Sequence, residues 1–315
     1  MLFFVVRRLG VFAVSLVGAS IVIFALLSLL PGDPAQIILG QQATPERLET
    51  LRAELGLDRP WPVRYADWAT GVAQGDFGES YLSGAAIGPM IAQRLQVTIP
   101  LAALGMVLAL VLAVPLGITA AARHRGAGDV LISGASQIGI AIPAFWAGIL
   151  LVTVFAVRLG WLPSGGFTPV TEDPVAWARS MVLPALSLAI VQAAILTRYI
   201  RSSILEVMRE DFVRTARAKG LTRGKALFRH GLRNAAIPVV TILGLQFAFL
   251  FAGTIVIENV FFLPGLGRMV LQAASERDLL LVQGTVMVLT FAILFINLVV
   301  DVAYRVIDPR LRSAS

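Results

Sequence analysis

Long apolar runs dominate the pattern of hydrophobic and polar positions along this chain. A helix that crosses about 30 Å of hydrocarbon needs about 20 predominantly apolar residues. Six runs of roughly this length or longer contain no charged residue: 9–30, 97–122, 130–157, 180–197, 234–257 and 279–300. The pattern predicts an all-α polytopic membrane protein with six transmembrane helices.

The polar segment between the first two runs, residues 31–96, contains helix signals of its own. Leu48, Leu51 and Leu55 recur at helical spacing, Thr44 with Pro45 is a helix start signal, and Gly56 is a stop signal. We therefore expect a small extracytoplasmic subdomain in this loop. The expected domains are 1–96, which joins the first transmembrane helix to this loop, and 97–315, a five-helix core with a cytoplasmic loop at 201–233.

Composition supports the membrane location and narrows the chemistry. Of the 315 residues, 57% are apolar and 14% are charged, whereas an average soluble domain is about 25% charged. The chain has no cysteine, which excludes disulfides, thiolate metal sites and cysteine nucleophiles. Its two histidines, His124 and His230, lie in no metal-binding motif. The sequence predicts no catalytic, cofactor-binding or metal site.

The net charge of +7 is unevenly divided among the segments that connect the runs. Membrane proteins carry an excess of Lys and Arg in their cytoplasmic loops. With the N-terminus inside, 17 of the 26 Lys and Arg and six of the 19 acidic residues lie in the cytoplasm. That face then carries +11 and the outer face −4. We expect both termini to be cytoplasmic.

Two runs carry small residues at every fourth position, a spacing that lets helices approach closely in lipid. They are Gly105, Ala109, Ala113, Gly117 and Ala121 in the second run, and Gly244, Ala248 and Ala252 in the fifth. Such a ridge serves either an interface with another subunit or packing within one chain. The sequence leaves both alternatives open.

The runs contain polar residues but no charge. The largest polar residues are Gln137, Gln192, Gln246, Gln283 and Asn297. Each is a candidate for lining a transport pathway, although hydrogen bonding between helices is the more common role. Proton- and ion-coupled transporters usually place an ionisable residue inside the membrane, so any energy for transport is expected to enter elsewhere. An intramembrane protease needs a base beside its serine, and neither histidine lies in a run.

The segment 201–233 is basic and has helical periodicity. Leu205, Met208, Phe212 and Ala216 form one apolar stripe, which predicts a helix. Glu210 and Arg214 are spaced as an i, i+4 ion pair, and Gly220 stands at a helix C-cap position. A second short helix is expected at Leu227, Phe228 and Leu232, after a turn near Thr222.

Two short helices at a glycine corner are suited to docking a protein, and the alternative is a basic amphipathic helix that lies on anionic lipid. A P-loop needs four residues between its glycines and Ser or Thr after its Lys. Gly220 and Gly224 are separated by three residues, and Ala226 follows Lys225. We therefore expect no ATP site in this chain.

The chain resembles the permease subunits of peptide-type ABC importers, the dipeptide/oligopeptide/nickel branch, over nearly its whole length. The segments that carry the resemblance, in order, are 30–35, 55–60, 75–78, 142–146, 159–163, 205–221, 262–267 and 308–310. The resemblance makes the basic loop the segment that such permeases insert into a groove of a cytoplasmic ATPase. It assigns ATPase coupling to Phe212, Arg214, Thr215, Ala216, Lys219, Gly220 and Leu221.

Two positions depart from the general importer pattern, since Arg214 stands where that pattern has Glu and Arg233 where it has Pro. Both departures are typical of the peptide branch. The resemblance implies the fold of a type I ABC importer permease, half of a pathway for peptides or similar small solutes, in the bacterial cytoplasmic (inner) membrane. The alternative class is a stand-alone secondary transporter or channel.

The resemblance also implies partners. These are a second homologous permease, two cytoplasmic ATPases that bind ATP and Mg, an extracytoplasmic substrate-binding protein, and membrane lipid. It implies no enzymatic activity and no cofactor in this chain, and no nucleic acid.

Overall fold

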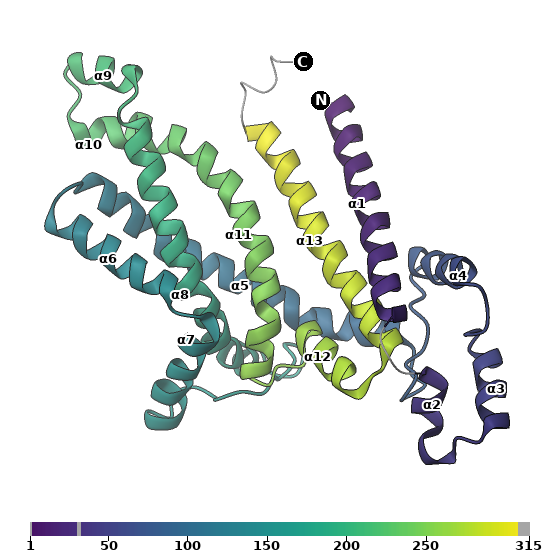
Figure 1. The fold of residues 1–315 in the computed structure, drawn as a ribbon. Coiled ribbons are helices and arrows are strands. Elements are labelled where there is room, and N and C mark those ends of the chain that lie inside the picture. Colours follow the sequence, from purple (N-terminus) through teal and green to yellow (C-terminus); the bar gives the residue numbers. More distant parts are fainter. Residues whose placement is uncertain (1, 30–32, 308–315) are drawn as a thin grey trace. The chain divides into compact units, whose positions relative to one another are not determined.

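The computed structural model describes residues 2–29 and 33–307, and the regular elements in these ranges are helices (Figure 1). In chain order they are α1 (Leu2–Leu29), α2 (Pro34–Leu39), η1 (Gly40–Gln42), α3 (Pro45–Glu54), α4 (Trp61–Ala73), α5 (Ile87–Ala122), α6 (Ala127–Ala141), α7 (Ala144–Leu151), η2 (Val152–Arg158), α8 (Pro174–Val207), α9 (Asp211–Ala218), α10 (Arg223–Ala226), η3 (Leu227–Gly231), α11 (Leu232–Val260), α12 (Leu266–Glu276) and α13 (Leu279–Ile307). The expected all-α class is confirmed. Of the family-like segments, residues 30–32 and 308–310 lie outside the described ranges.

Within the described residues, five helices are long and apolar enough to cross a membrane. They are Phe3–Leu29, Ile87–Ala122, Pro174–Val207, Asn234–Val260 and Leu279–Ala303. A bent pair, Ala127–Ala141 with Ala144–Arg158, makes a sixth span if the two halves are counted together. The polytopic architecture expected from the apolar runs is therefore present.

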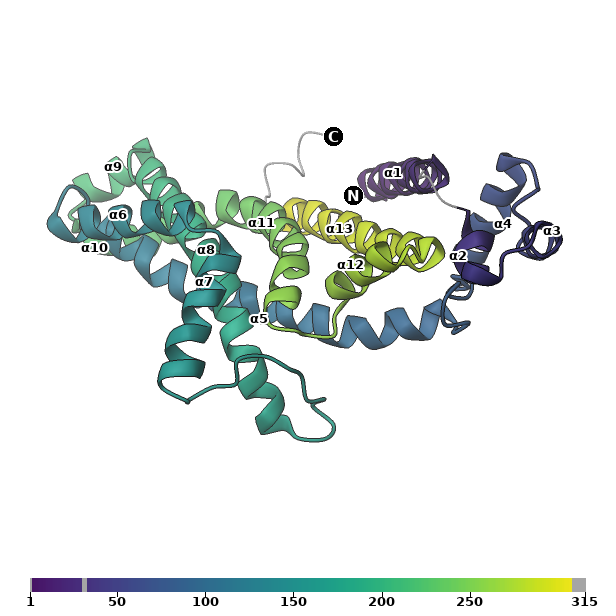
Figure 2. The ribbon, with the colours of Figure 1, turned by 60° about the horizontal axis from the view of Figure 1, so that its bottom comes forward.

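The third run, 130–157, does not form the continuous helix that its apolar character suggests. α6 ends at Ala141, α7 begins at Ala144, and the two helix directions differ by 100° (Figure 2). Ile142 is extended (φ −84°, ψ 121°) and Pro143 follows it. Proline supplies no N–H and disfavours the α conformation in the preceding residue, so the chain turns sharply at this point.

The spanning helices extend beyond the uncharged runs and include charged residues outside them, while the runs themselves contain no charge. Arg94 lies in α5, Arg201 in α8 and Glu258 in α11. Glu258 is fully buried, and its carboxylate accepts a hydrogen bond of 2.6 Å from the Thr98 hydroxyl. A buried carboxylate is costly unless it is hydrogen-bonded, so this contact ties α5 to α11 at a specific position.

The chain divides into two compact units. Unit 1 comprises residues 1–5, 98–263 and 296–315, and unit 2 comprises residues 6–97 and 264–295. In unit 1, helices α6, α7 and α11 pack against α8, which is the most deeply buried of the spanning helices (Figure 1). The expected division into 1–96 and 97–315 stays a prediction.

The small-residue ridge of α5 packs within the chain. A Cβ added to Gly105 would lie 3.2 Å from Leu188 Cβ, and one added to Gly117 would lie 2.7 Å from Ile200 Cγ2, both on α8. Ala109 and Ala113 between them are fully buried. Of the two alternatives left by the sequence, the structure therefore favours helix packing inside one chain for this ridge.

Unit 2 contains the expected short helices of the long loop. In α3, the Thr44 hydroxyl accepts a hydrogen bond from the Arg47 N–H, and Pro45 is the first helical residue. Gly56 follows the helix with a positive φ of 64°. The expected helix start and stop are confirmed, whereas the side of the membrane on which the loop lies stays a prediction.

Two contacts hold unit 2 together. Phe24 of α1 makes ring contacts with Trp61, Tyr65 and Trp68 of α4, at centroid distances of 5.3–5.6 Å. The Ser80 hydroxyl donates a 2.5 Å hydrogen bond to the buried Asp278 carboxylate just before α13. Segments far apart in the sequence are thereby joined by both apolar and polar contacts.

Candidate functional site

The basic corner, defined as residues 208–231, begins where α8 ends. Val207 is the last residue of α8 and Met208 its C-cap. Glu210 is extended (φ −64°, ψ 149°) and starts α9. The stripe from Leu205 to Ala216 is thus divided between two helices, which corrects the expectation of one continuous helix. Acidic residues at the new start are favourable because the N-terminal end of a helix carries partial positive charge.

The side chains of α9 differ in detail from the sequence-based expectation. Val213 is fully buried, whereas Phe212 is 42% exposed and Ala216 is half-buried. Arg214 pairs with Asp211 at 3.2 Å, and not with Glu210 as the spacing suggested. The Thr215 hydroxyl donates to the Asp211 carbonyl at 2.9 Å. Phe212 and Arg214 therefore remain accessible, and Val213 anchors the helix.

The glycine corner has the geometry expected from its sequence. Gly220 has a φ of 96°, a conformation in which residues with a Cβ are strained. Its N–H donates to the Arg217 carbonyl, and the Leu221 N–H donates to the Ala216 carbonyl. Lys219, directly before Gly220, is the C-cap of α9. These two bonds form a Schellman motif, which ends α9 and reverses the chain.

The second short helix follows directly. Thr222 caps α10, with its hydroxyl accepting from the Lys225 N–H at 3.4 Å. The chain then passes through η3 into α11, as the spacing of Leu227 and Leu232 predicted. Phe228 is 67% exposed. The side chain of Arg233, the position that departs from the importer pattern, lies outside the described part of the chain.

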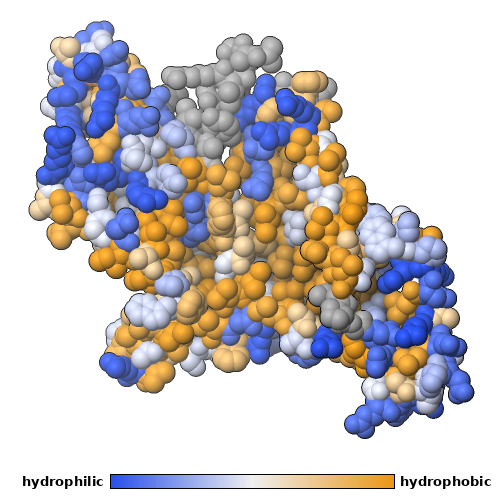
Figure 3. Space-filling model, in the orientation of Figure 1, coloured by the Kyte–Doolittle hydropathy of each residue, from blue (hydrophilic) through white to orange (hydrophobic). Residues whose placement is uncertain are grey.

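Positive charge is concentrated on the surface of the basic corner. Its exposed basic residues are Arg209, Arg214, Arg217, Lys219, Arg223, Lys225 and Arg229. Within the described residues, Arg214 is the member of this group that forms an ion pair. Hydrophilic side chains cover α9 and α10 in Figure 3, in contrast to the apolar surface of α6 and α8. This surface suits an acidic partner.

A hollow of about 580 Å³ lies beside the corner. It is lined by Arg201, Ser202, Leu205, Glu206, Arg209, Glu210 and Asp211. Its walls carry both acidic and basic groups, and they come from the end of α8 and the start of α9. A partner that docks on α9 therefore also has access to the end of a spanning helix.

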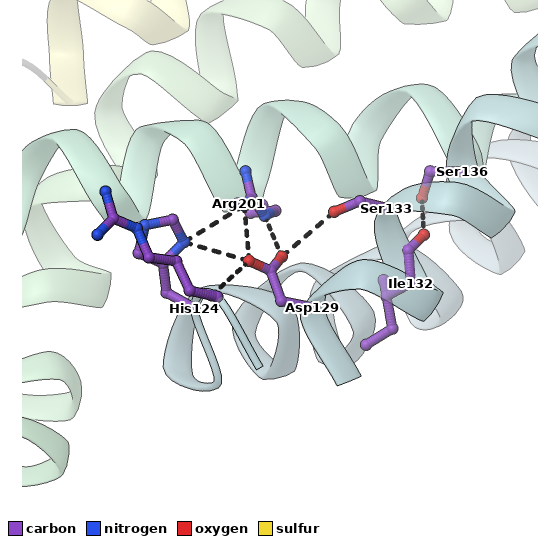
Figure 4. A network of polar contacts seen from close by, with 7 residues as sticks. His124, Asp129, Ile132, Ser133, Ser136 and Arg201 are labelled. Carbon is purple, nitrogen blue, oxygen red and sulfur yellow. Dashed lines mark hydrogen bonds and ion pairs between the residues drawn. The ribbon is translucent and has the colours of Figure 1, made fainter. Parts of the chain in front are cut away.

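A buried ion-pair network ties that end of α8 to the α5–α6 turn (Figure 4). Arg201 donates to both oxygens of the Asp129 carboxylate, at 2.5 and 2.8 Å. His124 Nδ1 lies 3.2 Å from the Asp129 carboxylate. The Ser133 hydroxyl donates a hydrogen bond to the same carboxylate at 3.2 Å. The Arg125 N–H donates to the same carboxylate at 2.9 Å. Bidentate Arg–carboxylate pairs have a fixed geometry, so α8 and α6 are held in register.

Sequence reasoning missed this network. Asp129 follows Gly126 closely and lies in the first turn of α6, which is a usual place for an acidic residue at a helix start. Arg201 looked like one cation among many in the basic segment. The pairing connects residues 72 positions apart, and no local pattern indicates such a contact.

Ser20 of α1 and Ser136 of α6, two of the serines in the apolar runs, make helix contacts. Ser136 donates to the Ile132 carbonyl at 2.9 Å, as Figure 4 shows, and Ser20 donates to the Val17 carbonyl at 2.7 Å. The second partner of Ser20 is the Tyr65 hydroxyl at 2.8 Å. None of these partners is a general base, so the contacts give no support to a serine protease.

The polar residues proposed to line a pathway lie in different surroundings. Gln192 is 6% exposed, and its Nε2 donates to the Gln246 carbonyl at 3.2 Å, which joins α8 to α11. Gln137 is exposed on α6, Asn297 is half-buried on α13, and Gln283 is 7% exposed in unit 2. The structure therefore brings Gln192 and Gln246 together, and their contact is the interhelical hydrogen bond that such residues commonly form.

The long apolar helices, with an exposed, charged corner between two of them, define a polytopic helical membrane protein. Comparison with known families makes this specific. Residues 113–313 match the family described as binding-protein-dependent transport system inner membrane component, and residues 1–102 match the N-terminal region of such components. The chain belongs to this family and is a permease component of an ABC importer. The comparisons give no support to a stand-alone transporter.

Similar proteins agree with this assignment. A Brucella abortus (strain 2308) protein named as a peptide transport system permease is 43% identical over 293 residues, which cover 93% of each chain. The glutathione transport system permease protein of Salmonella typhimurium (strain LT2) is 40% identical over 312 residues, or 99% of each chain. The expected resemblance to peptide-type permeases is confirmed.

Solved structures of two transporters share the fold. A chain of the MetNI methionine ABC transporter, in inward-facing conformations, has a TM-score of 0.59 and 15% identity, and the match covers 70% of this chain and 96% of that one. A chain of an amino acid ABC transporter has a TM-score of 0.54 and 17% identity, covering 69% and 94%. Both matches concern the fold alone.

Proposed function

We propose that this chain forms half of the translocation pathway of an ATP-driven importer, together with a second homologous permease. In this proposal two cytoplasmic ATPases bind ATP and Mg, and an extracytoplasmic binding protein delivers the solute. This chain itself contributes no catalytic group, cofactor or metal. The observation that carries the proposal is the rigid, basic, exposed corner at residues 208–231, which joins two spanning helices.

The corner has the properties of a mechanical coupling element. Val213 is buried and the Schellman motif at Gly220 fixes the direction of the chain, so α9 cannot rotate freely on the rest of unit 1. Phe212 and Ala216 offer apolar surface to a groove, while Arg214 and Lys219 reach its rim. Thr215 and Leu221 support the helix end. A motion of the ATPase is then passed to α8 and α11.

The proposed solute is a peptide or a similar small molecule. This rests on the names of the relatives, which are permeases of peptide and glutathione transport systems. Gln192 and Gln246, joined between α8 and α11, are the polar residues that we place nearest to the path. Gln137, Gln283 and Asn297 are weaker candidates for it.

We also propose an orientation in which the basic corner faces the cytoplasm, both termini are cytoplasmic, and the loop 31–96 lies outside. The distribution of Lys and Arg supports it, because the face with the corner carries +11. The family description, an inner membrane component, supports location in the bacterial inner membrane.

The test of coupling is the variant Gly220→Val. Gly220 has open space around it, so the change acts through its φ of 96° and not through a clash. A β-branched residue at such an angle is strained, so the corner rearranges. We expect uptake by the assembled transporter to fall about tenfold or more, while ATP hydrolysis continues and the amount of membrane-inserted protein is unchanged.

Gly224→Val is the matched control. Gly224 also has open space around it, but it lies in α10 and has no positive φ. Uptake by this variant should stay close to wild type. Uptake by Gly220→Val equal to that by Gly224→Val would contradict docking through this corner.

A further inference from the structure

Unit 2 contains a cavity of about 270 Å³ that none of the functions above uses. It lies among α1, α4, the loop before α5, and the start of α13. Its lining residues are Phe24, Leu55, Gly56, Leu57, Arg59, Arg64, Asp67, Trp68, Gly71, Asp76, Phe77, Gly78, Tyr81, Leu280 and Gln283. Its walls are about equally polar and apolar, and the polar groups comprise hydrogen-bond donors and carboxylates.

Three side chains in the wall are hydrogen-bond donors without a partner among the described residues. The Trp68 indole N–H and the Gln283 amide N–H are buried without a hydrogen-bond partner in the described part of the chain. Arg64 is half-buried, and its side chain forms no hydrogen bond or ion pair with the described residues. Buried polar groups are rarely left unpaired in native proteins, so the two buried N–H groups indicate a missing acceptor, and the half-buried Arg64 guanidinium lies in the same wall.

The acidic groups of the same wall are already engaged. Asp67 pairs with Arg59 at 3.1 Å, and Asp76 accepts a hydrogen bond from the Gly78 N–H at 2.9 Å. Burial raises the pKa of Tyr81, so its phenol keeps its proton. The two Arg and two Asp of the wall balance in charge, so what remains without a partner is a set of hydrogen-bond donors, and the complementary ligand group is an oxygen acceptor such as a phosphate.

The position of the cavity narrows the kind of oxyanion. Phe24 is near the end of α1, and Leu280 is the second residue of α13, and both helices are long and apolar enough to span a membrane. Trp61, Tyr65 and Trp68 gather beside Phe24. Tyr and Trp are enriched at the depth of lipid headgroups, where the available oxyanion is the phosphate of a phospholipid.

We propose that this cavity binds the phosphate group of a membrane phospholipid. Arg64 supplies the charge, and the Trp68 and Gln283 N–H groups supply hydrogen bonds to phosphate oxygens. Phe24 and Leu280 contact the first part of an acyl chain. This role is independent of the coupling function of the basic corner.

The test measures lipid binding by the purified transporter in detergent. Phosphatidylglycerol is added, and its retention is followed by native mass spectrometry together with the thermal unfolding midpoint. Wild type should retain the lipid and gain stability. Arg64→Gln and Gln283→Leu should each weaken retention about tenfold, since a hydrogen bond to a charged group is lost.

Arg47→Gln is the matched control, because it removes the same charge from unit 2 at an exposed residue of α3 that does not line the cavity. It should retain the lipid like wild type. Equal retention by Arg64→Gln and wild type would overturn the proposal, as would equal losses with Arg47→Gln and Arg64→Gln. Inorganic phosphate that stabilises the protein as strongly as the lipid would overturn the assignment to lipid. If Arg64→Gln does not fold, Gln283→Leu decides alone.

Discussion

At the scale of single residues, Gly117 is a position where the helix packing of unit 1 leaves no room for a side chain. A Cβ there would lie 2.7 Å from Ile200 Cγ2 and 3.2 Å from the Thr197 carbonyl oxygen. Overpacking of this kind typically costs about 1–3 kcal/mol. We expect Gly117→Ala to lower the thermal unfolding midpoint of the purified protein, measured in detergent.

Gly134→Ala provides the comparison for this variant. Gly134 lies in α6 with no atom within 4 Å of the added Cβ, and alanine has a higher helix propensity than glycine. Its unfolding midpoint should be no lower than that of wild type. A Gly117→Ala protein as stable as Gly134→Ala would show that α5 and α8 do not pack as closely as the structure has them.

Residues whose role is local were predictable from the sequence, and residues whose role depends on a neighbour were not. The cap at Thr44 and the positive φ of Gly220 follow from short motifs, and both are confirmed. The partner of Arg214 depends on where α9 begins, so the spacing suggested Glu210 while the structure has Asp211. Val213 likewise became the buried residue because α9 is a separate helix from α8.

At the scale of elements, proline alone does not predict where a spanning helix breaks. Pro100, Pro115, Pro184 and Pro238 all lie inside continuous helices. Pro143 instead separates α6 from α7. Both α6 and α7 pack against α8, so contacts with a third helix favour the bent arrangement. An uncharged run of suitable length gives no information about such contacts, and the run 130–157 therefore looked like one helix.

The connection between α6 and α8 should depend on the Asp129–Arg201 pair. The side chains are 6% and 26% exposed, and removing one member of a buried pair leaves an uncompensated charge that costs about 3–5 kcal/mol. We expect Asp129→Ala to lower the unfolding midpoint strongly. The double variant Asp129→Leu/Arg201→Met should recover most of that loss, because apolar replacement of both members leaves no unpaired charge.

Arg198→Met controls for the loss of a cation on the same helix. Arg198 is exposed and lies over the Tyr199 ring at 5.7 Å from its centroid. The unfolding midpoint of the Arg198→Met variant should stay near that of wild type. Losses that simply add in the double variant would show that Asp129 and Arg201 stabilise the protein independently of each other.

At the scale of the whole molecule, class and approximate span number followed from composition and run length, whereas the division into units did not. Residues 264–295 join residues 6–97 in unit 2. One of the contacts within this unit, between Ser80 and Asp278, links positions 198 residues apart. Such pairings arise from the complete tertiary structure. The buried Glu258 also escaped prediction, because it falls one residue beyond an uncharged run.

Whether the bent pair α6–α7 crosses the membrane decides the topology. Cysteine labelling can test this, and because the chain has no cysteine, only the introduced cysteines react. We expect single cysteines at Glu49 and Glu172 to react with a membrane-impermeant maleimide in spheroplasts. A cysteine at Arg123 should react only after permeabilisation, because the bent pair crosses the membrane between residues 123 and 172. All three wild-type side chains are exposed, so access to the reagent is limited by the membrane and not by burial.

The physical basis of this expectation is the charge difference between the faces, +11 against −4. If α6 and α7 instead form a re-entrant loop, residues 123 and 172 lie on the same side and label together. The number of crossings then becomes odd, and the two termini lie on opposite sides of the membrane. Joint labelling of Arg123→Cys and Glu172→Cys from one side would therefore refute six spans. Labelling of Glu172→Cys without Arg123→Cys would establish that the bent pair crosses the membrane.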